Sequence, residues 1–292
     1  MSLKTKTVLT ISTVFAFLAL AFFAVSHVVA NNIAAELERD DIHQNIERAL
    51  QALEREIVTL DKFAEDWAAW DDTYIFVEDR NEEYIEKNLV DSTFEVLRLN
   101  YAVFINTRGE IVYARGYDPE AGEEIAVPPG IVEYIFKKDP FSVQHEAGGG
   151  LKGLVVMPEG PVLVAARPVL KSDDSGPARG TLIFGRILRD KDLKELSEIT
   201  RLPLSFHTPG AVDFRDLTPA GFLENGEAYY TGVISPQESA GFAVIKDLRG
   251  ETALILQVNA ERRTARAFQA ARKAFGIFLV LAGALFCALA AF

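Results

Sequence analysis

The sequence contains a single cysteine, Cys287, among 292 residues. An intramolecular disulfide is therefore excluded, and the fold must be held together by its own hydrophobic core. Basic residues are also scarce, with 30 Lys and Arg against 42 Asp and Glu and a net charge of −12. Nucleic acids and anionic lipid surfaces are bound through basic patches, so the acidic middle of the chain suits neither. We expect no nucleic acid among the partners.

The sequence also lacks the short motifs of common enzymes. Neither the phosphate-binding G-x-x-x-x-G-K-[ST] nor the hydrolase motif G-x-S-x-G occurs. One G-x-G-x-x-G match, at Gly148, Gly150 and Gly153, precedes a strand-like segment instead of opening a helix, so we expect a flexible turn there. Four histidines lie far apart in the sequence: His27, His43, His145 and His207. Without carboxylates or cysteines at ligand spacing they disfavour a metal site, and we predict no catalytic residues, no metal, no cofactor and no enzyme activity.

Both ends of the chain are long apolar runs. Residues 7–30 and 274–292 carry no charged side chain, and roughly 20 apolar residues suffice to cross about 30 Å of bilayer hydrocarbon. The first run could also be a cleaved signal peptide ending at residues 28–30, although it is longer than the usual apolar core of about 7–15 residues. Lys4 and Lys6 precede it and favour a cytoplasmic N-terminus.

Two membrane spans place the residues between them outside the cytoplasm. The basic cluster at residues 262–273 then lies outside as well, against the positive-inside tendency, but long external segments cross membranes largely regardless of charge. We therefore expect a domain anchored in the inner (plasma) membrane, with the lipid bilayer as a partner and the main domain extracytoplasmic or periplasmic.

Apolar residues recur every three or four positions between Ile33 and Trp70, with no Pro or Gly in between. This spacing predicts a long amphipathic helix that continues outward from the first span. The apolar stripe between Ile46 and Leu60 either pairs with the same helix of a second copy, which gives a homodimer, or packs on the sheet of its own chain.

Short strands dominate the chain from residue 100 onward. Residues 100–117 and 151–170 are typical of hairpins that turn at 107–109 and 158–160. Further strands are expected at 181–188, 202–206, 227–235, 241–248 and 252–258, and short helices at 82–97, 128–139 and 190–200. Hairpin-connected strands make an antiparallel sheet, so the predicted fold class is α+β.

The stretch "DWAAWDDTYIF" holds both tryptophans of the chain. On one continuous helix Trp67, Trp70, Asp71 and Tyr74 share a face. The rings either cap the core, where each buries about 150–250 Å², or line a pocket for a small polar or cationic ligand, because aromatic faces attract cations. A ring wall with one face on the core and the other on a ligand satisfies both.

The segment "YARGYD" again brings Arg, Tyr and Asp together, at the end of a predicted strand. We therefore predict a ligand site bordered by the side chains of these two stretches: Trp67, Trp70, Asp71, Tyr74, Arg115 and Tyr117. Asp71 is expected to pair with a cationic group of the ligand or to hold Arg115.

Three segments resemble the fourth type of CHASE domain: "DWAAWDDTYIFVEDRNEEYIEKNLVDSTF", "LNYAVFINTRGEIVYARGYD" and "ARPVLKSDDSGPARGTLIFGRIL". The tryptophan motif with Asn81, Tyr84 and Asn88 after it is the most specific part, and the resemblance covers roughly residues 60–260. This family comprises extracytoplasmic sensors of bacterial and archaeal histidine kinases, diguanylate cyclases and phosphodiesterases. The resemblance implies a PAS-like antiparallel sheet with a long N-terminal helix, flanked by two transmembrane helices.

The expected organisation has five parts. Residues 1–30 form the N-terminal tail and first span, 31–63 the membrane-proximal helix, 64–260 the PAS-like sensor domain, 261–273 a connecting helix and 274–292 the second span. The resemblance implies that the domain binds a small ligand and passes a conformational signal across the membrane to a cytoplasmic signalling partner. No kinase core or cyclase motif occurs, so such an output is expected outside this chain. The alternative is an anchored envelope scaffold without a small ligand.

Overall fold

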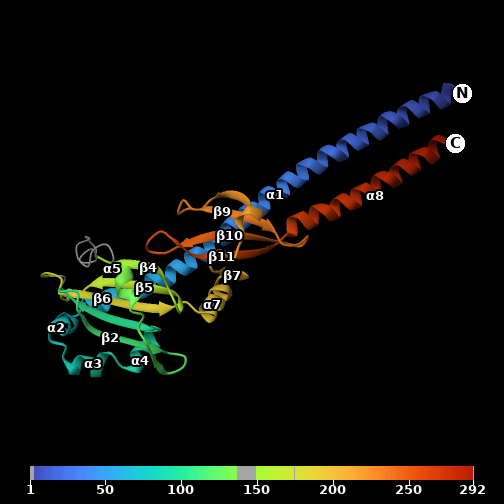
Figure 1. Ribbon diagram of the computed structural model, residues 1–292. Helices are drawn as coiled ribbons and strands as arrows, with labels where there is room; N and C mark the ends of the chain where they lie inside the picture. Colours follow the sequence, from blue (N-terminus) through green and yellow to red (C-terminus); the bar gives the residue numbers. More distant parts are fainter. Residues whose placement is uncertain (1–2, 137–148, 174, 292) are drawn as a thin grey trace. The chain divides into compact units, whose positions relative to one another are not determined.

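The computed structural model describes residues 3–136, 149–173 and 175–291 (Figure 1). The chain divides into two compact units: one holds residues 1–45, 214–242 and 258–292, and the other holds 46–213 and 243–257. His145 and Gly148, which the sequence analysis singled out, lie outside the described residues.

The N-terminal helix α1 runs without a break over Leu3–Ala68. The absence of Pro and Gly from this segment permits such length, because either residue weakens a helix interior. Large apolar side chains of α1 are exposed from Ile11 to Leu37 and buried from Ile42 onward. The first half of the helix is thus apolar on its outer surface, and the second half carries a one-sided core stripe. The predicted long N-terminal helix is confirmed.

The predicted dimer stripe on α1 is buried within this chain. Ile46 and Leu60 are 0% exposed, and Leu53 and Ile57 are also buried. Of the two interpretations of this stripe, the structure supports packing inside its own unit. The homodimer remains a prediction, but this stripe no longer provides its interface.

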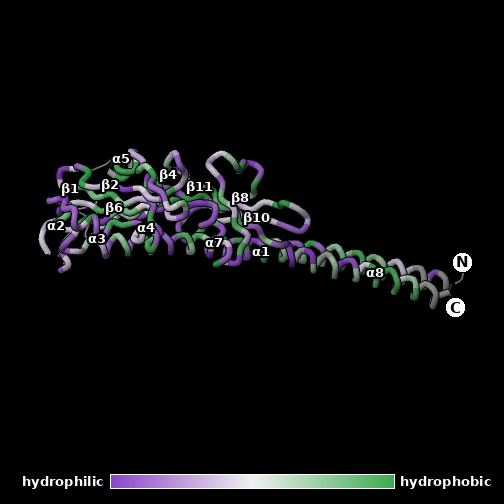
Figure 2. The backbone as a smooth tube through the Cα atoms, turned by 90° about the horizontal axis from the view of Figure 1, so that it is seen from below, coloured by the Kyte–Doolittle hydropathy of each residue, from purple (hydrophilic) through white to green (hydrophobic). Residues whose placement is uncertain are grey.

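Helix α1 and the C-terminal helix α8 (Arg263–Ala291) are both long and apolar enough to cross a membrane, judged by length and composition. Figure 2 shows hydrophobic colouring along both of them. They are neighbours, because Phe23 and Phe275 stack with ring centroids 6.5 Å apart and ring planes 5° apart.

Six strands of the second unit form an antiparallel sheet in the order β3-β2-β1-β6-β5-β4. They are β1 Tyr101–Asn106, β2 Ile111–Asp118, β3 Glu123–Ile125, β4 Leu151–Met157, β5 Gly160–Pro168 and β6 Gly180–Ile187. The predicted hairpin turns are present: the Gly109 backbone N–H donates to the Asn106 carbonyl at 3.0 Å, and Met157 of β4 pairs with Gly160 of β5 across a two-residue turn. The first strand of this sheet in chain order, β1, lies beside its last, β6, at the centre of the sheet, as in PAS-like domains. The short β3 is an additional strand at one edge. The α+β, PAS-like fold class is confirmed.

The G-x-G-x-x-G match is part of this sheet. Gly150 directly precedes β4, and Gly153 lies within it opposite Val164 of β5. The described part of the match is therefore a strand and its approach, so the flexible turn that we expected there is wrong for these two residues.

Among the described residues, five short helices accompany the sheet. They are α2 Asp71–Asp79, α3 Glu82–Asn88, α4 Asp91–Leu97, α5 Gly130–Phe136 and α7 Asp190–Thr200. A second sheet has the order β7-β11-β10-β9-β8, and its strands β10 and β11 contribute residues to both units. Its strands are β7 Leu204–His207, β8 Thr218–Phe222, β9 Ala228–Val233, β10 Glu238–Lys246 and β11 Thr252–Glu261, with a short 3₁₀ helix at Phe214–Asp216 before β8.

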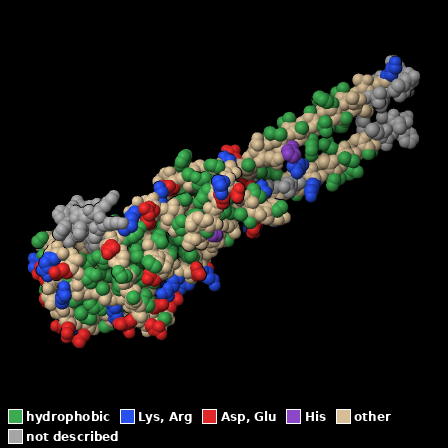
Figure 3. Space-filling model, viewed as in Figure 1, with side chains coloured by type: hydrophobic (Ala, Val, Ile, Leu, Met, Phe, Trp, Pro, Cys, Tyr) green, Lys and Arg blue, Asp and Glu red, His purple; other side chains and the backbone are tan. Residues whose placement is uncertain are grey.

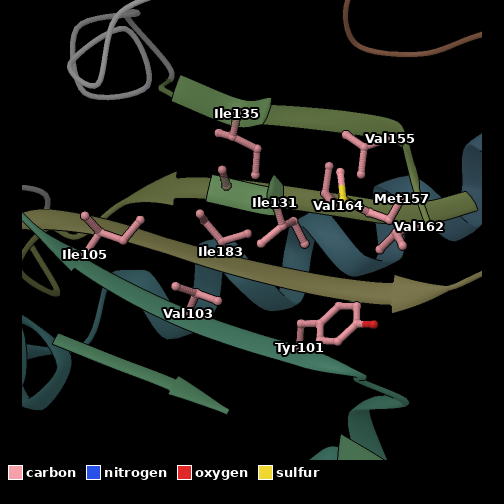
Figure 4. Close-up of a cluster of buried hydrophobic side chains, with 11 residues drawn as sticks. Tyr101, Val103, Ile105, Ile131, Ile135, Val155, Met157, Val162, Val164 and Ile183 are labelled. Atoms are coloured by element: carbon pink, nitrogen blue, oxygen red, sulfur yellow. The ribbon is translucent and has the colours of Figure 1, made fainter. Parts of the chain in front are cut away.

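The first sheet has two different faces, because side chains alternate along each strand. One face, here called the α5 face, packs against Ile131 and Ile135 of helix α5 (Figure 4). Its buried strand residues are apolar: Tyr101, Val103, Ile105, Val155, Met157, Val162, Val164, Ala166 and Ile183.

The opposite face, here called the helix face, packs against α1 and α2. Phe184 of β6 contacts the Trp67 ring of α1, with centroids 5.8 Å apart, and Phe104 of β1 contacts the Phe76 ring of α2, with centroids 5.2 Å apart. Unlike the α5 face, the helix face also carries charged side chains. All six predicted site residues lie on the elements of this face.

Candidate functional site

The two tryptophans meet where α1 ends and α2 begins. Their rings stack with centroids 4.7 Å apart. The Trp67 ring also makes an edge-on contact with the ring of Phe184. The helix breaks between them, because α1 ends at Ala68 and Trp70 has extended dihedral angles as the residue before α2. The expectation of a single continuous helical face is therefore wrong, although the rings do form one cluster.

Asp71 and Tyr74 bond to the connection between β5 and β6, which the structure describes over residues 169–173 and 175–179. An Asp71 carboxylate oxygen accepts a hydrogen bond from the Ser172 backbone N–H at 3.1 Å, and the Tyr74 hydroxyl donates to the Pro177 carbonyl at 3.1 Å. The guanidinium of Arg179 lies 4.1 Å from the centre of the Tyr74 ring, and the Lys171 ammonium lies 5.8 Å from it. The Tyr74 ring therefore already attracts cations, here from the chain itself.

Arg115 and Tyr117 form a second cluster on β2 with α4. The Arg115 guanidinium donates to the Leu89 carbonyl at 2.6 Å and to the Asp91 carboxylate at 2.5 Å, and it lies 5.2 Å from the centre of the Phe94 ring. The Tyr117 hydroxyl donates to Glu95 at 3.2 Å. Since Asp71 is bonded to Ser172, the structure does not pair Asp71 with Arg115.

An aromatic layer occupies the helix face beside these clusters. Phe76 stacks on Tyr84 at 4.3 Å, and Phe104 meets both rings edge-on. The buried hydroxyls of Tyr84 and Thr73 share a hydrogen bond of 2.6 Å. Burial raises the pKa of Tyr84 to about 12. This layer makes the tryptophan motif and the segment after it part of the core, as the core-capping interpretation expects.

A buried ion pair that we did not predict joins α1 to the sheet. Asp61 of α1 is 3% exposed and accepts two hydrogen bonds from Arg167 of β5, both at 2.6 Å, and one from Lys152 of β4 at 3.1 Å. Burial alone would raise the pKa of Asp61, but the hydrogen bonds from Arg167 and Lys152 outweigh it and hold this pKa below its ordinary value. Asp61 is therefore a charged anchor between the helix and two strands.

A second charged cluster lies one helical turn earlier on α1. Arg186 of β6 donates to the carboxylate of Glu56 at 2.9 Å and to the carbonyls of Leu97 and Arg98 at 3.1 and 2.9 Å. Burial and the nearby charge of Arg98 lower the pKa of Arg186. These three bonds tie the strand both to α1 and to the end of α4.

The second charged cluster extends onto α7. Arg98 donates to Asp192 at 2.9 Å and to Glu195 at 2.8 Å, and Arg189 pairs with Asp118 at 2.8 Å. Small cavities of about 10 and 40 Å³ lie beside this cluster. They have room for little more than water, so the cluster connects elements and does not enclose a ligand.

The sequence did contain a signal for these charges. Asp61 is four residues after Ile57 and three before Ala64, which is the spacing of the buried stripe. Arg167 continues the alternation of Leu163 and Ala165, and Arg186 likewise follows Leu182 and Phe184 at two-residue steps. A charge at an inward-facing position needs a partner, so such positions mark buried ion pairs.

The chemistry of the described residues is that of recognition and attachment. Ring faces attract cations and carboxylates accept hydrogen bonds, whereas Arg115, Arg167 and Arg186 are already bonded within the chain. Within residues 3–136, 149–173 and 175–291, no group of three or more His, Cys, Asp and Glu side chains could hold a metal ion.

The chain matches the CHASE4 domain over residues 52–207. It is 29% identical over 250 residues to the methanogenesis regulatory histidine kinase FilI of Methanothrix harundinacea, an alignment that covers 84% of this chain and 27% of that protein. The chain thus spans about a quarter of the length of this curated relative.

Solved structures with similar folds include extracellular sensor domains. The extracellular domain of the putative histidine kinase vpHK1S-Z8 has a TM-score of 0.47 and 12% identity, covering 80% of this chain and 95% of that one. The periplasmic domain of Vibrio cholerae LuxQ has a TM-score of 0.45 and 11% identity, covering 75% and 98%. Values this low give no correspondence between individual residues. Because the family match covers more than half of its length, the chain belongs to the CHASE4 domain family, the class of extracytoplasmic sensory domains that its sequence resembles.

Proposed function

We propose that this chain is the membrane-anchored sensory part of a signalling protein, which binds a small ligand and transmits a conformational signal through α1 across the membrane. The observation that carries the proposal is the continuity of α1. One unbroken helix contains both an apolar span and the residues that bond to the strands of the sensor sheet.

The attachment of α1 to the sheet is polar and directional. Asp61 bonds to β4 and β5, Glu56 bonds to β6, and the Ala68 carbonyl accepts from the Leu170 backbone N–H at 3.0 Å. A shift of the strands relative to α1 must break or stretch these bonds. Such contacts favour discrete positions of the helix, which is the physical requirement for a two-state switch.

The proposed ligand site is the tryptophan cluster with Asp71, Tyr74 and the described residues of the β5–β6 loop, 169–173 and 175–179. The Tyr74 ring already holds two cationic side chains of the chain, and Asp71 offers a carboxylate at its edge. A ligand ammonium or guanidinium would replace Arg179 or Lys171 over the ring and would release the loop. Arg115 and Tyr117 have partners of their own on α4, and their place in the same site remains a prediction.

The remaining partners follow from the membrane anchor. We propose the plasma membrane as the location, a homodimer as the assembly and a cytoplasmic signalling partner or output domain as the receiver. The curated relative is a regulatory histidine kinase of which this chain spans 27%, which supports an output located outside the aligned part.

The test of ligand binding uses the full chain in lipid nanodiscs and its thermal unfolding. Polyamines, amino acids and quaternary ammonium compounds are added singly, and a ligand at 100 times its Kd stabilises the folded state by about 2.7 kcal/mol. Asp71→Asn should abolish most of this stabilisation, whereas the control Asp72→Asn, on the same helix and equally exposed, should retain it. If no compound stabilises the chain, or if both variants respond alike, the proposed site is wrong and the scaffold alternative gains support.

The test of signal passage measures a distance within the spans. Spin labels are placed at the exposed Leu18 of α1 and Leu281 of α8, with Cys287→Ser to remove the native thiol. The stabilising ligand should change the distance distribution between the labels. Asp61→Asn should leave ligand affinity nearly unchanged but reduce the change in distance. An unaltered distance in the ligand-saturated wild type would contradict signal passage.

A further inference from the structure

A groove of about 200 Å³ lies between α1 and α8, within the first unit. Its apolar floor includes Phe23 and Phe275, whose rings stack on each other. Its polar rim comes from Ser26, His27 and Asn31 of α1 and Arg272 of α8. Figure 3 shows a histidine and basic side chains where the two helices run side by side.

Arg272 is the unusual member of the rim, because nothing in the described residues neutralises its charge. Other arginines of the same basic cluster are paired: Arg262 with Glu38 at 3.2 Å, and Arg263 and Arg266 with Glu261 at 2.9 and 3.0 Å. Within the described part of the chain, Arg272 has no hydrogen bond or ion pair. The sequence contains no acidic residue after Glu261 and none before Glu36, so neither helix can supply a carboxylate at this level.

The position of the groove along the helices identifies the missing anion. The apolar run of α1 ends at Ala30, where Asn31 and Asn32 follow, and that of α8 begins at Ala274, directly after Arg272 and Lys273. The rim therefore lies where the hydrocarbon of a bilayer gives way to headgroups, and a guanidinium at this level can reach a lipid phosphate. We propose that the groove binds a phospholipid, with the phosphate on Arg272 and one acyl chain along Phe23 and Phe275.

The rim offers suitable groups for a phosphodiester. A guanidinium forms charge-assisted, bidentate hydrogen bonds to phosphate oxygens. The Asn31 amide already lies 3.2 Å from the His27 ring nitrogen Nδ1, so both side chains stand at the same rim and can turn donors toward a bound anion. A lipid held here would bridge α1 and α8, the two helices that carry the proposed signal, and the site rests on the membrane anchoring proposed above.

The experiment measures lipid binding to the delipidated full chain in detergent by native mass spectrometry. The probes are dioleoyl phosphatidylglycerol and dioleoylglycerol, which has the same acyl chains and no phosphate. Wild type should bind the phospholipid at least tenfold more tightly than the diacylglycerol. Arg272→Gln should weaken phospholipid binding about tenfold. The control Lys273→Gln removes the same charge from the next residue, which does not line the groove, and should change binding less than about twofold.

Other occupants give different results. Equal binding of the two lipids would show an apolar groove without phosphate recognition, and equal losses in the two variants would show diffuse charge attraction; either overturns the proposal. Competition by millimolar inorganic phosphate would indicate a soluble anion instead. Lipid-free dimers that disappear in Arg272→Gln would show a contact between copies.

If Arg272→Gln does not fold, Asn31→Ala tests the rim, and full-strength phospholipid binding by that folded variant would count against the proposed site. None of these readouts depends on the small-ligand test.

Discussion

The two faces of the PAS-like sheet are stabilised in different ways. The α5 face is an almost purely aliphatic contact with a short helix, whereas the helix face combines aromatic rings with the buried charges Asp61 and Arg186 and the half-buried Arg167. Apolar burial is non-directional and tolerates small shifts and repacking. Buried ion pairs add little net stability, because the cost of desolvating the two charges offsets their attraction. Removing one partner is nevertheless strongly destabilising, because it leaves the other charge buried and unpaired.

This difference assigns separate tasks to the two faces. The α5 face can hold the sheet together in any of several closely related packings. The helix face fixes where α1 lies against β4, β5 and β6, because Asp61 and Glu56 each have specific partners. In the proposed function, a ligand signal must therefore act on the helix face to move α1.

The largest loss of stability is expected from Arg186→Met. This change leaves the Glu56 carboxylate and the carbonyls of Leu97 and Arg98 without their donor, and a broken buried pair costs about 3–5 kcal/mol. Denaturant unfolding of the full chain measures the loss. The control Arg108→Met removes an exposed hairpin ion pair, which solvent screens, and should change stability far less than Arg186→Met. Equal losses of stability in the two variants would show that the buried ion pair of the helix face contributes no more than an exposed one.

The next largest loss is expected from Asp61→Asn, about 2–3 kcal/mol at neutral pH, because a hydrogen bond to a charged group contributes about 1.5–3 kcal/mol. The folded-state pKa of Asp61 lies below its ordinary value of 3.8, so its contribution is complete well above that value and is lost as pH falls through the folded-state pKa. Wild type and Asp61→Asn should therefore converge in stability as pH falls below 3.8. The exposed Asp66→Asn on the same helix should show no such convergence, and a pH-independent gap for Asp61→Asn would refute the ion-pair assignment.

The architecture of the first sheet was predictable because its signals are local. Two-residue alternation and glycine-containing turns mark each hairpin, and the two predicted hairpins lie at β1–β2 and β4–β5. The short strands β3 and β8 were not predicted, because their few residues pair only through contacts with distant segments. Helix periodicity likewise predicted α1 but could not place its end at Ala68, since the break before Trp70 depends on the packing of the tryptophans.

The candidate site was less predictable than the fold. The sequence correctly singled out the tryptophan motif as a place where rings and charges meet. It did not reveal that Asp71 and Tyr74 contact a loop about 100 residues later in the chain, or that Arg115 pairs with Asp91 of α4. Partners so distant in sequence are fixed by tertiary structure, which a single sequence does not show.

A smaller loss of folding stability is expected from removing the Tyr84 hydroxyl. Tyr84→Phe leaves Thr73 unpaired in the core, at a cost of about 1–2 kcal/mol, and Thr73→Val in the same chain should restore part of the loss. Because the pKa of Tyr84 is raised to about 12 in the folded state, its contribution is complete below the ordinary value of 10 and declines as pH rises from there. Unfolding midpoints between pH 8 and 11 measure this decline, which should be smaller in Tyr84→Phe than in the wild type because the other buried tyrosines remain. An additive double mutant would show that the two hydroxyls do not interact.

The smallest loss of folding stability is expected from Ile183→Val on the α5 face. Ile183 is fully buried in the aliphatic cluster, and removing one methyl group from such a site costs about 0.5–1.5 kcal/mol. Neighbouring aliphatic side chains can partly close the space, and no directional bond to α1 is lost. The variant should therefore bind a stabilising ligand as tightly as wild type and show the same ligand-dependent distance between labels at Leu18 and Leu281, in contrast to Asp71→Asn and Asp61→Asn. Ligand titration and measurement of the distance between the labels, on the same preparation of Ile183→Val, test both expectations. A loss of ligand affinity in Ile183→Val as large as that in Asp71→Asn would place the ligand on the α5 face and reverse the assignment of tasks to the two faces.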